Sequence, residues 1–262
     1  MFFVIFLVAM LFSAVGFKKY IWFISIGYGL AIAGIGGALL IIFRGSFGFW
    51  TAAYSVLFVI YGLRLAGYLA YRETDRTTYS KKMAGEIKES DKVPMWEKVL
   101  IWVSAALLYA CMAAPMLFRL QSAKGTDALL VIGIILSACG VVMESVSDVQ
   151  KQMAKKKDPG SFVSTGLFSI VRCPNYLGEL LLWTGVFLSG ITAYSGVWQW
   201  IAAIGGYIGI VYVMFSGARR LEMRQERTYG SDPRYRKYAD TTPIMIPFVP
   251  LFSVKDIKWL VA

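Results

Sequence analysis

Long apolar runs separated by short polar stretches dominate the hydropathy pattern of this chain. Several of these runs reach the roughly 20 residues that an α-helix needs to cross the hydrocarbon core of a bilayer. The pattern predicts an all-α, polytopic transmembrane helical bundle, built as a single integral-membrane domain over residues 1–262. The expected spans, about seven, are 2–17, 20–43, 47–71, 98–118, 128–149, 174–194 and 196–217.

The basic residues in the connections predict how these spans are oriented. Lys and Arg gather after the first, third, fifth and seventh spans, and none lies between the sixth and seventh. Cytoplasmic loops are enriched in Lys and Arg, so we expect the N-terminus outside and the C-terminus in the cytoplasm. Lys18 and Lys19 follow the first apolar run and do not precede it, which favours a retained helix over a cleaved signal peptide.

With this orientation, polar side chains from several spans reach the cytoplasmic side. Ionisable groups inside a span are costly, and they usually face a cavity or a partner and mark a site. Simpler interpretations remain: the arginines as interfacial anchors, the acids paired with nearby lysines, and the tyrosine packed or hydrogen-bonded against a neighbouring helix. The residues concerned are Tyr61, Arg64, Glu144, Asp148, Asn175, Glu179, Arg219 and Arg220.

The stretch "SIVRCPNYLGELLLW" (169–183) predicts a helix that opens with a polar face. Pro174 suits the first helical turn, where its missing N–H costs nothing. Asn175 and Glu179 are four residues apart and share a face of that helix. Arg172 lies just ahead of it, so a cation, an amide and a carboxylate gather where the helix begins.

Composition supports the membrane class and excludes several functions. Hydrophobic residues make up 57% of the chain and charged residues 16%, against roughly 25% charged in soluble domains. The net charge of +11 fits basic loops on anionic lipid better than nucleic-acid binding. There is no histidine, and the three cysteines form no CxxC pair. We therefore expect no metal site, no His-based catalysis and no nucleic-acid partner.

The predicted polar face suits a large polar cofactor. Amide and carboxylate groups bind ribose hydroxyls and the amide edges of bases, while Arg and Lys neutralise phosphates. The segment 150–173 is expected to be a basic loop with Gly160 and Gly166, compatible with phosphate contact, although it carries no Walker or GxGxxG motif. The pattern indicates a cofactor that enters from the cytosol and a lipophilic substrate that enters from the bilayer.

Four stretches resemble segments of the steroid 5α-reductase-like membrane reductase superfamily, which has a bacterial branch. "LFSIVRCPNYLGELLLW" (167–183) resembles its signature, which is also close to that of isoprenylcysteine and phospholipid methyltransferases. "YGLRLAGYLAYR" (61–72) resembles the segment with the reductases' catalytic tyrosine. "MESVSDVQKQMAKKKDPG" (143–160) resembles their NADPH-holding segment. The tail "RQERTYGSDPRYRKYADTTPIMIPF" (224–248) resembles the shared C-terminal tail.

The resemblance implies an oxidoreductase acting on CH–CH groups in the bacterial cell membrane, with its active site facing the cytoplasm. It would use NADPH to reduce a carbon–carbon double bond conjugated to a carbonyl in a steroid-like or other lipid. Tyr61 would donate the proton and Arg64 would position it, within substrate-side helices at 1–120. In the C-terminal part, 121–262, the implied cofactor-binding residues are Glu144, Asp148, Lys155, Arg172, Asn175, Tyr176, Glu179, Arg219, Arg220, Tyr235 and Tyr238.

Two departures from the superfamily pattern leave alternatives open. Cys173 stands where a histidine is common, and no Glu or Asp precedes Glu73, whereas steroid reductases carry a Gln-Glu pair on an early helix. The means of gripping a 3-oxo steroid is therefore incomplete or different. An S-adenosylmethionine-dependent methyltransferase of a lipid or prenylated substrate is one alternative, although such enzymes often have fewer spans and lack the tyrosine. A non-enzymatic lipid-binding or transport protein is the other.

Overall fold

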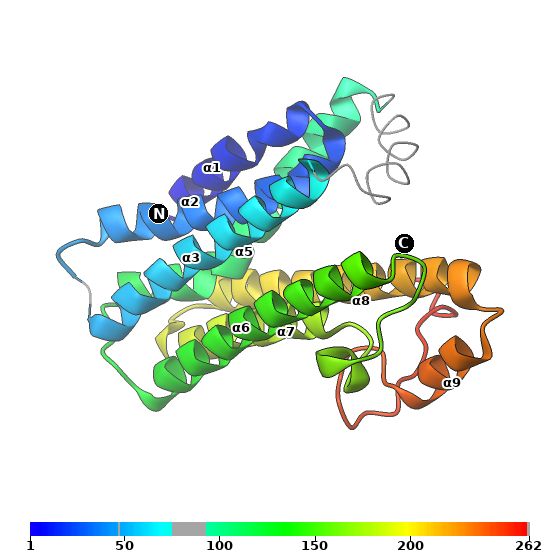
Figure 1. The fold of residues 1–262 in the computed structure, drawn as a ribbon. Helices are drawn as coiled ribbons and strands as arrows, with labels where there is room; N and C mark the ends of the chain where they lie inside the picture. Colours follow the sequence, from blue (N-terminus) through cyan, green and yellow to red (C-terminus); the bar gives the residue numbers. More distant parts are fainter. Residues whose placement is uncertain (47, 75–92, 261–262) are drawn as a thin grey trace. The chain divides into compact units, whose positions relative to one another are not determined.

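The computed structural model describes residues 1–46, 48–74 and 93–260, and all regular secondary structure in these ranges is helical (Figure 1). The predicted all-α class is confirmed. The charged stretch at 75–92, which holds most of the basic residues expected between the third and fourth spans, lies outside the described residues. The α-helices are α1 (Phe2–Ser13), α2 (Ile26–Ile42), α3 (Phe49–Thr74), α5 (Met95–Gln121), α6 (Ala128–Lys157), α7 (Pro174–Gly190), α8 (Val197–Tyr229) and α9 (Pro233–Thr241).

Every predicted apolar segment overlaps one of these helices over most of its length, and α7 begins at Pro174 as expected. Among the described residues, five helices are long and apolar enough to cross a membrane: α3, α5, α6, α8, and α7 with the short 3₁₀ turn Ile191–Ala193. The helices α1 and α2 are apolar but shorter, with 12 and 17 residues. The chain is thus an integral membrane protein, while the count of seven spans and their orientation stay predictions.

The second predicted span, 20–43, is not one continuous helix. A 3₁₀ turn (Tyr20–Ile24) precedes α2, and Ser25 between them has φ −124° and ψ −95°. The Ser25 hydroxyl donates to the Ile21 carbonyl at 2.8 Å, a local bond that competes with the regular helix. Gly27 permits the tight join, because a Cβ atom there would lie 2.5 Å from the Trp22 carbonyl oxygen.

Two helices run well past their apolar spans. The predicted fifth and seventh spans end at 149 and 217, whereas α6 continues to Lys157 and α8 to Tyr229. The added residues are mostly Lys, Arg, Gln, Glu, Met and Ala, which are good helix formers. The predicted loop over 150–173 therefore begins only after Lys157, close to Pro159. Hydropathy marks where a helix leaves the apolar phase and not where it ends.

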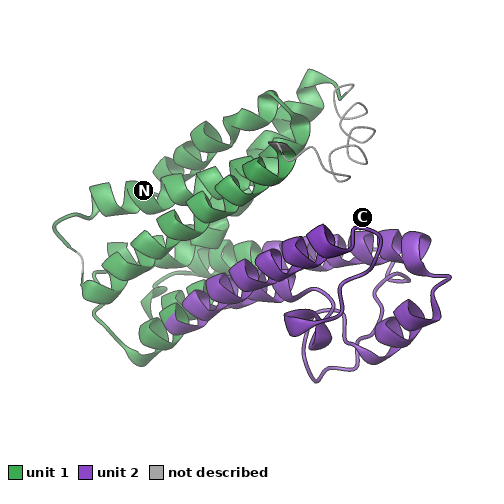
Figure 2. Ribbon diagram, viewed as in Figure 1, with its two compact units in different colours: residues 1–134, 186–207 green, residues 135–185, 208–262 purple. Residues whose placement is uncertain are grey.

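The chain forms two compact units (Figure 2). Unit 1 comprises Met1–Ile134 and Val186–Tyr207, and unit 2 comprises Ile135–Gly185 and Ile208–Ala262. The boundaries fall within α6, α7 and α8. Both predicted catalytic residues belong to unit 1, and all the predicted cofactor-binding residues belong to unit 2.

Within unit 1, α2 and α3 meet backbone to backbone. A Cβ atom on Gly62 would lie 2.3 Å from the Gly29 carbonyl oxygen and 2.5 Å from the Ala33 amide nitrogen. On the other helix, a Cβ atom on Gly29 would lie 2.7 Å from the Gly62 carbonyl oxygen and 2.8 Å from the Ala66 amide nitrogen. Small residues four apart on each helix permit this approach, as is common between membrane helices.

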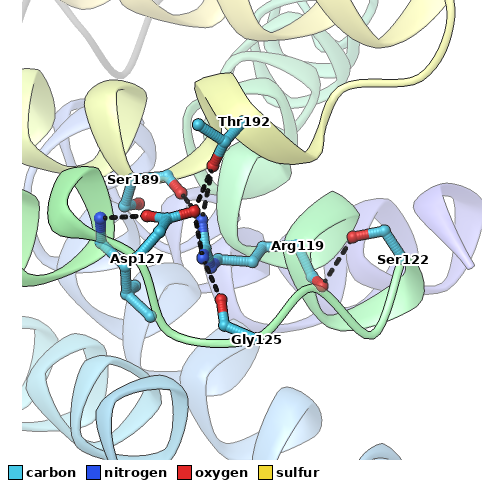
Figure 3. Close-up of polar contacts among 7 residues, drawn as sticks. Arg119, Ser122, Gly125, Asp127, Ser189 and Thr192 are labelled. Atoms are coloured by element: carbon cyan, nitrogen blue, oxygen red, sulfur yellow. Dashed lines mark hydrogen bonds and ion pairs between the residues drawn. The ribbon is translucent and has the colours of Figure 1, made fainter.

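A buried arginine joins helix ends within unit 1 (Figure 3). Arg119, near the end of α5, has no exposed surface. Its Nη1 donates to the Ser189 carbonyl at 2.8 Å and to the Thr192 hydroxyl at 3.0 Å. Its Nη2 donates to the Asp127 carboxylate at 2.8 Å and to the Gly125 carbonyl. These bonds tie the end of α5 to the loop that follows it and to the end of α7.

Asp127 completes this cluster from the start of α6. One of its carboxylate oxygens caps the helix by accepting from the Leu130 amide at 2.9 Å. The other accepts from Arg119 and from the Thr192 hydroxyl. Burial acts to raise the pKa of Asp127, but the bonds from Thr192, Arg119 and Leu130, with the charge of Arg119, outweigh it and lower the pKa to about 2. The carboxylate is therefore ionised at neutral pH and neutralises the buried arginine.

Candidate cofactor site

The helices α6 and α7 of unit 2 meet at a second pair of glycines. A Cβ atom on Gly140 would lie 2.4 Å from the Gly178 carbonyl oxygen, and one on Gly178 would lie 2.7 Å from the Glu144 amide nitrogen. The contact brings the predicted site residue Glu144 of α6 next to Gly178, which directly precedes Glu179. Asp148 follows one turn further along α6, and all three carboxylate side chains are buried. Unit 2 thus gathers acidic groups from two helices.

The C-terminal tail is bound to the residues that precede α7. The Arg172 amide donates to the Pro243 carbonyl at 2.8 Å, and the Cys173 amide donates to the Ile244 carbonyl at 2.9 Å. The Ile244 amide in turn donates to the Leu251 carbonyl at 2.8 Å. Backbone bonds therefore place the tail against the helix start that the signature sequence pointed to.

Arg172 and Glu222 form a buried ion pair behind this tail. Nη2 of Arg172 donates to a Glu222 carboxylate oxygen at 2.9 Å and to the Phe252 carbonyl. The other Glu222 oxygen accepts from the Val254 amide at 2.9 Å. A buried pair persists when such additional bonds satisfy it. Sequence reasoning missed Glu222, one of two acids among the arginines near the end of α8.

Several buried polar atoms of unit 2 have no hydrogen-bond partner among the described residues. They are Nε and Nη1 of Arg172, Oδ1 of Asn175, the Ser216 hydroxyl and the Tyr235 hydroxyl. Leaving such a group unpaired costs about 1–3 kcal/mol, and native proteins do so rarely. The set offers both hydrogen-bond donors and acceptors, which is the chemistry that a polar ligand needs. Of these residues, sequence reasoning did not identify Ser216.

Tyr235 and Tyr238 of α9 differ in how their hydroxyls are used. Burial raises the pKa of Tyr235 to about 12, against the lowering effect of the nearby Arg172 charge, so the hydroxyl remains a donor at neutral pH. The Tyr238 hydroxyl donates to the Phe168 carbonyl at 2.7 Å, and burial raises its pKa as well. The Phe162 ring packs against both, at centroid distances of 5.4 Å and 5.6 Å. The Tyr238 hydroxyl is thus bonded to the backbone, whereas the Tyr235 hydroxyl lies beside the Arg172 guanidinium and makes no regular hydrogen bond among the described residues.

Two of the predicted cofactor-binding cations make contacts inside unit 2. The Lys155 ammonium donates to the Tyr229 hydroxyl at 2.8 Å and lies 5.3 Å from the centroid of its ring. Arg219 donates through Nε to the Lys255 carbonyl at 2.9 Å and through Nη1 to the Leu260 carbonyl at 3.0 Å. Both side chains hold other segments of unit 2 together as the structure stands.

Tyr176 and Arg220 lie on facing parts of α7 and α8. The Tyr176 ring is 3.4 Å from where a Cβ atom on Gly217 would lie, so this glycine makes room for the ring. Arg220 is exposed. Its charge, like the charges of Arg224 and Glu179, lies near the Tyr176 hydroxyl. An exposed arginine close to a buried cluster is suited to meet an anion from solvent.

The local backbone explains why a glycine occupies position 166, without any contact to a phosphate. Its φ is +65°, a conformation that L side chains rarely adopt. A Cβ atom there would lie 2.5 Å from Oε1 of Gln150, and this same oxygen accepts from the Leu167 amide at 2.9 Å. The glycine thus permits α6 to hold the turn that leads toward Arg172. Its role as a phosphate-contacting residue stays a prediction.

Cys173, which stands where the reductase resemblance expects a histidine, is fully buried. Burial raises the pKa of its thiol to about 12. A thiol that stays protonated near neutral pH does not exchange protons as an imidazole does. The position therefore serves packing and the backbone bond to Ile244.

In unit 1, the predicted catalytic Tyr61 is fully buried on α3. Its hydroxyl lies 3.2 Å from the hydroxyl of Tyr28 on α2, a residue that sequence reasoning did not identify. The Arg64 guanidinium lies 5.6 Å from the ring centroid of Tyr68, one turn further along α3. The hydrogen bond to a neighbouring helix matches the simpler interpretation of Tyr61 and is equally compatible with an acid held in place, so the catalytic assignments stay predictions.

The fold and the site define an all-helical integral membrane protein that buries charged and unpartnered polar groups beside its α7 start and C-terminal tail. The chain belongs to the family described as "Protein of unknown function (DUF1295)", which matches residues 7–242. This match extends over most of the chain and over the larger part of each unit.

Two curated relatives match over shorter stretches. The steroid 5-alpha-reductase DET2 of Arabidopsis thaliana is 29% identical over 121 residues, which are 45% of this chain and 41% of the relative. The uncharacterized protein C594.04c of Schizosaccharomyces pombe is 35% identical over 86 residues, 33% of this chain and 24% of the relative. The chain thus covers less than half the length of either relative. The match to DET2 confirms the resemblance to the steroid 5α-reductase-like superfamily. No solved structure is detectably similar to the chain.

Proposed function

We propose that this protein is a membrane reductase that uses NADPH to reduce a carbon–carbon double bond conjugated to a carbonyl in a lipophilic molecule. The observation that carries the proposal is the set of buried polar atoms on Arg172, Asn175 and Tyr235 that make no hydrogen bond within the described part of the chain. These residues belong to the segments that resemble the reductases' cofactor-binding regions. The similarity to a protein named as a steroid 5-alpha-reductase supports the same class.

The polar groups of unit 2 fit such a cofactor chemically. The Arg172 Nε and Nη1 donors and the Tyr235 hydroxyl suit phosphate or amide oxygens, and Asn175 Oδ1 suits an amide or hydroxyl donor. Glu144, Asp148 and Glu179 suit ribose hydroxyls or an amide N–H. Lys155, Arg219 and the exposed Arg220 suit phosphates, and Tyr176 completes the α7 side.

NADPH, when bound, would supply the hydride for the β-carbon of the conjugated system. The Tyr61 hydroxyl of unit 1 would stabilise the negative charge on the carbonyl oxygen and supply the proton. Arg64 positions Tyr61 on the same helix. The substrate enters from the bilayer of the cell membrane, and the cofactor enters from the cytoplasmic side, toward which the basic connections are oriented.

Cofactor binding separates this proposal from the methyltransferase alternative. The purified protein in detergent is heated with NADPH, with S-adenosylmethionine or with S-adenosylhomocysteine. A ligand at 100 times its Kd adds about 2.7 kcal/mol to the stability of the folded state, so we expect a rise in Tm of several degrees with NADPH alone. A rise with the S-adenosyl compounds and not with NADPH overturns the proposal.

Turnover is measured on lipid extracts incubated with the protein and NADPH, by mass spectrometry for components that gain two hydrogens. We expect Tyr61→Phe to lower turnover by about 10²–10⁴-fold while NADPH still raises the Tm. Asn175→Ala is expected to weaken NADPH binding itself. Full turnover by Tyr61→Phe contradicts the catalytic assignment and leaves the cofactor proposal standing.

A further inference from the structure

We propose that Tyr28 is the positioning residue for proton transfer by Tyr61. Its hydroxyl orients the Tyr61 hydroxyl and stabilises the phenolate that remains when Tyr61 has given up its proton. The inference rests on the proposed reductase function and adds a residue to it that neither the motifs nor the relatives point to. It concerns unit 1 alone.

The two hydroxyl groups meet in a buried, largely apolar setting. The oxygens are 3.2 Å apart, within hydrogen-bond distance. Tyr61 is 0% and Tyr28 is 7% exposed. Their rings are edge-on, with centroids 6.3 Å apart and an interplanar angle of 72°. The rings are not stacked, and the hydroxyl groups form the polar contact between them.

The backbone explains why these tyrosines meet. Tyr28 directly precedes Gly29, and Tyr61 directly precedes Gly62. Those glycines form the contact at which α2 and α3 touch, where an added Cβ atom would lie 2.3–2.8 Å from backbone atoms of the other helix. The two phenols stand directly before the two glycines of this contact, so the hydroxyl pair is a consequence of the close packing of α2 and α3.

A third tyrosine packs against Tyr28. The Tyr109 ring of α5 lies 4.9 Å from the Tyr28 ring between centroids. The Tyr109 hydroxyl donates to the Phe23 carbonyl at 2.9 Å, so this hydroxyl is directed away from the Tyr28–Tyr61 pair. In the structure the Tyr61 hydroxyl donates and the Tyr28 oxygen accepts. The Tyr28 O–H therefore has only to rotate toward the Tyr61 oxygen once that oxygen becomes a phenolate.

The proton balance shows why a second hydroxyl is needed. As the hydride adds to the β-carbon, the O–H bond of Tyr61 breaks and its proton moves to the reduced substrate. The electron pair stays on the Tyr61 oxygen, which becomes a phenolate inside an apolar bundle and later regains a proton from water. No Glu or Asp precedes Glu73, so α1 and α2 hold no carboxyl group for this task. A hydrogen bond from the Tyr28 hydroxyl to the phenolate is charge-assisted and about twice as strong as a neutral one.

Tyr28→Phe tests the inference, with Tyr109→Phe as a matched control that removes a neighbouring buried hydroxyl bonded elsewhere. The substrate is the extract component that gains two hydrogens. We expect Tyr28→Phe to lower kcat by roughly 10–100-fold with the KM for NADPH unchanged, and Tyr109→Phe to stay within about threefold. Since both hydroxyls act in one step, Tyr28→Phe/Tyr61→Phe should be no slower than Tyr61→Phe alone.

A readout without turnover checks the contact itself. With Tyr61→3-fluorotyrosine, the fluorine resonance of the protein in detergent, without NADPH, is expected to move when Tyr28→Phe is added and to stay in place with Tyr109→Phe. Melting temperatures of all variants show whether they are folded. If Tyr28→Phe is folded and has the same kcat as Tyr109→Phe, the role of Tyr28 is wrong. The same holds if the fold-loss in kcat of the double variant equals the product of the two single fold-losses. Either result leaves the proposed reductase function standing. A wild type that reduces no extract component overturns the proposed function, and this inference with it.

Discussion

The two units each bury an arginine completely, and the two arginines are used differently. Arg119 of unit 1 donates from both Nη atoms to four oxygens, and within 1–46, 48–74 and 93–260 only its Nε lacks a partner. Arg172 of unit 2 makes both of its side-chain bonds through Nη2, which leaves Nε and Nη1 without partners among the described residues. Each guanidinium has a carboxylate partner, Asp127 or Glu222, so the difference lies in the remaining donors.

This difference separates a structural contact from a candidate binding contact. A buried guanidinium whose N–H groups nearly all donate to protein oxygens stabilises the fold and offers few donors to a ligand. One that keeps donors unpaired in a buried setting lowers the stability of the protein until something binds. Unit 1 shows the first case at the ends of its helices, and unit 2 shows the second where the tail meets α7.

The largest expected effect comes from removing each arginine in turn. Arg119→Met and Arg172→Met each strand a carboxylate and are expected to lower the free energy of unfolding by about 3–5 kcal/mol. Only Arg172→Met should also abolish the rise in Tm with NADPH. Thermal unfolding in detergent with and without NADPH measures both quantities.

Arg172→Met/Glu222→Met is the control for folding. It removes both charges, so it should recover most of the stability lost in Arg172→Met without recovering NADPH binding. If Arg119→Met loses the NADPH response as completely as Arg172→Met while remaining folded, the distinction between the two arginines is wrong.

A smaller effect is expected from acid acting on the Asp127 partner of Arg119. The folded pKa of Asp127 is lowered to about 2 from an ordinary value of 3.8. Its stabilising contribution is therefore full above pH 4 and is lost as the pH falls from about 4 to 2. We expect about 1–2 kcal/mol, because the side chain is partly exposed. Asp127→Asn should be less stable at neutral pH and should lack this part of the acid dependence, so equal acid sensitivity in both proteins would contradict the assignment.

The smallest effects distinguish Tyr235 from Tyr238. Tyr238→Phe removes the hydrogen bond to the Phe168 carbonyl and should cost about 1 kcal/mol of stability with little change in NADPH affinity. Tyr235→Phe removes a hydroxyl that lies beside Arg172 but makes no regular hydrogen bond in the part of the chain that the structure describes. Stability should therefore be unchanged or slightly higher, while the Kd for NADPH rises. Thermal unfolding and NADPH titration of the two variants side by side are the measurement. The reverse pattern would place the ligand contact at Tyr238.

The sequence anticipated the candidate site in part. The cluster at the start of α7 was readable because Pro174, Asn175 and Glu179 are local in sequence and their spacing is that of a helix. Glu222 was not, since its partner Arg172 is 50 residues away. The pairing of Tyr28 with Tyr61 was not readable either. It depends on the backbone contact between Gly29 and Gly62, and the hydropathy pattern does not mark these two glycines.

The amino-acid sequence by itself determined the membrane class, the helical composition and the start of α7. A bilayer demands long apolar segments with internally satisfied backbones, and the helix-start residues act over a few positions. Only the tertiary structure decided that the helix is interrupted at Ser25 and that α6 and α8 extend past their apolar spans. It also decided which buried donors have hydrogen-bond partners. Those outcomes depend on which helix faces meet, and contacts between residues distant in sequence leave no periodic mark along the chain.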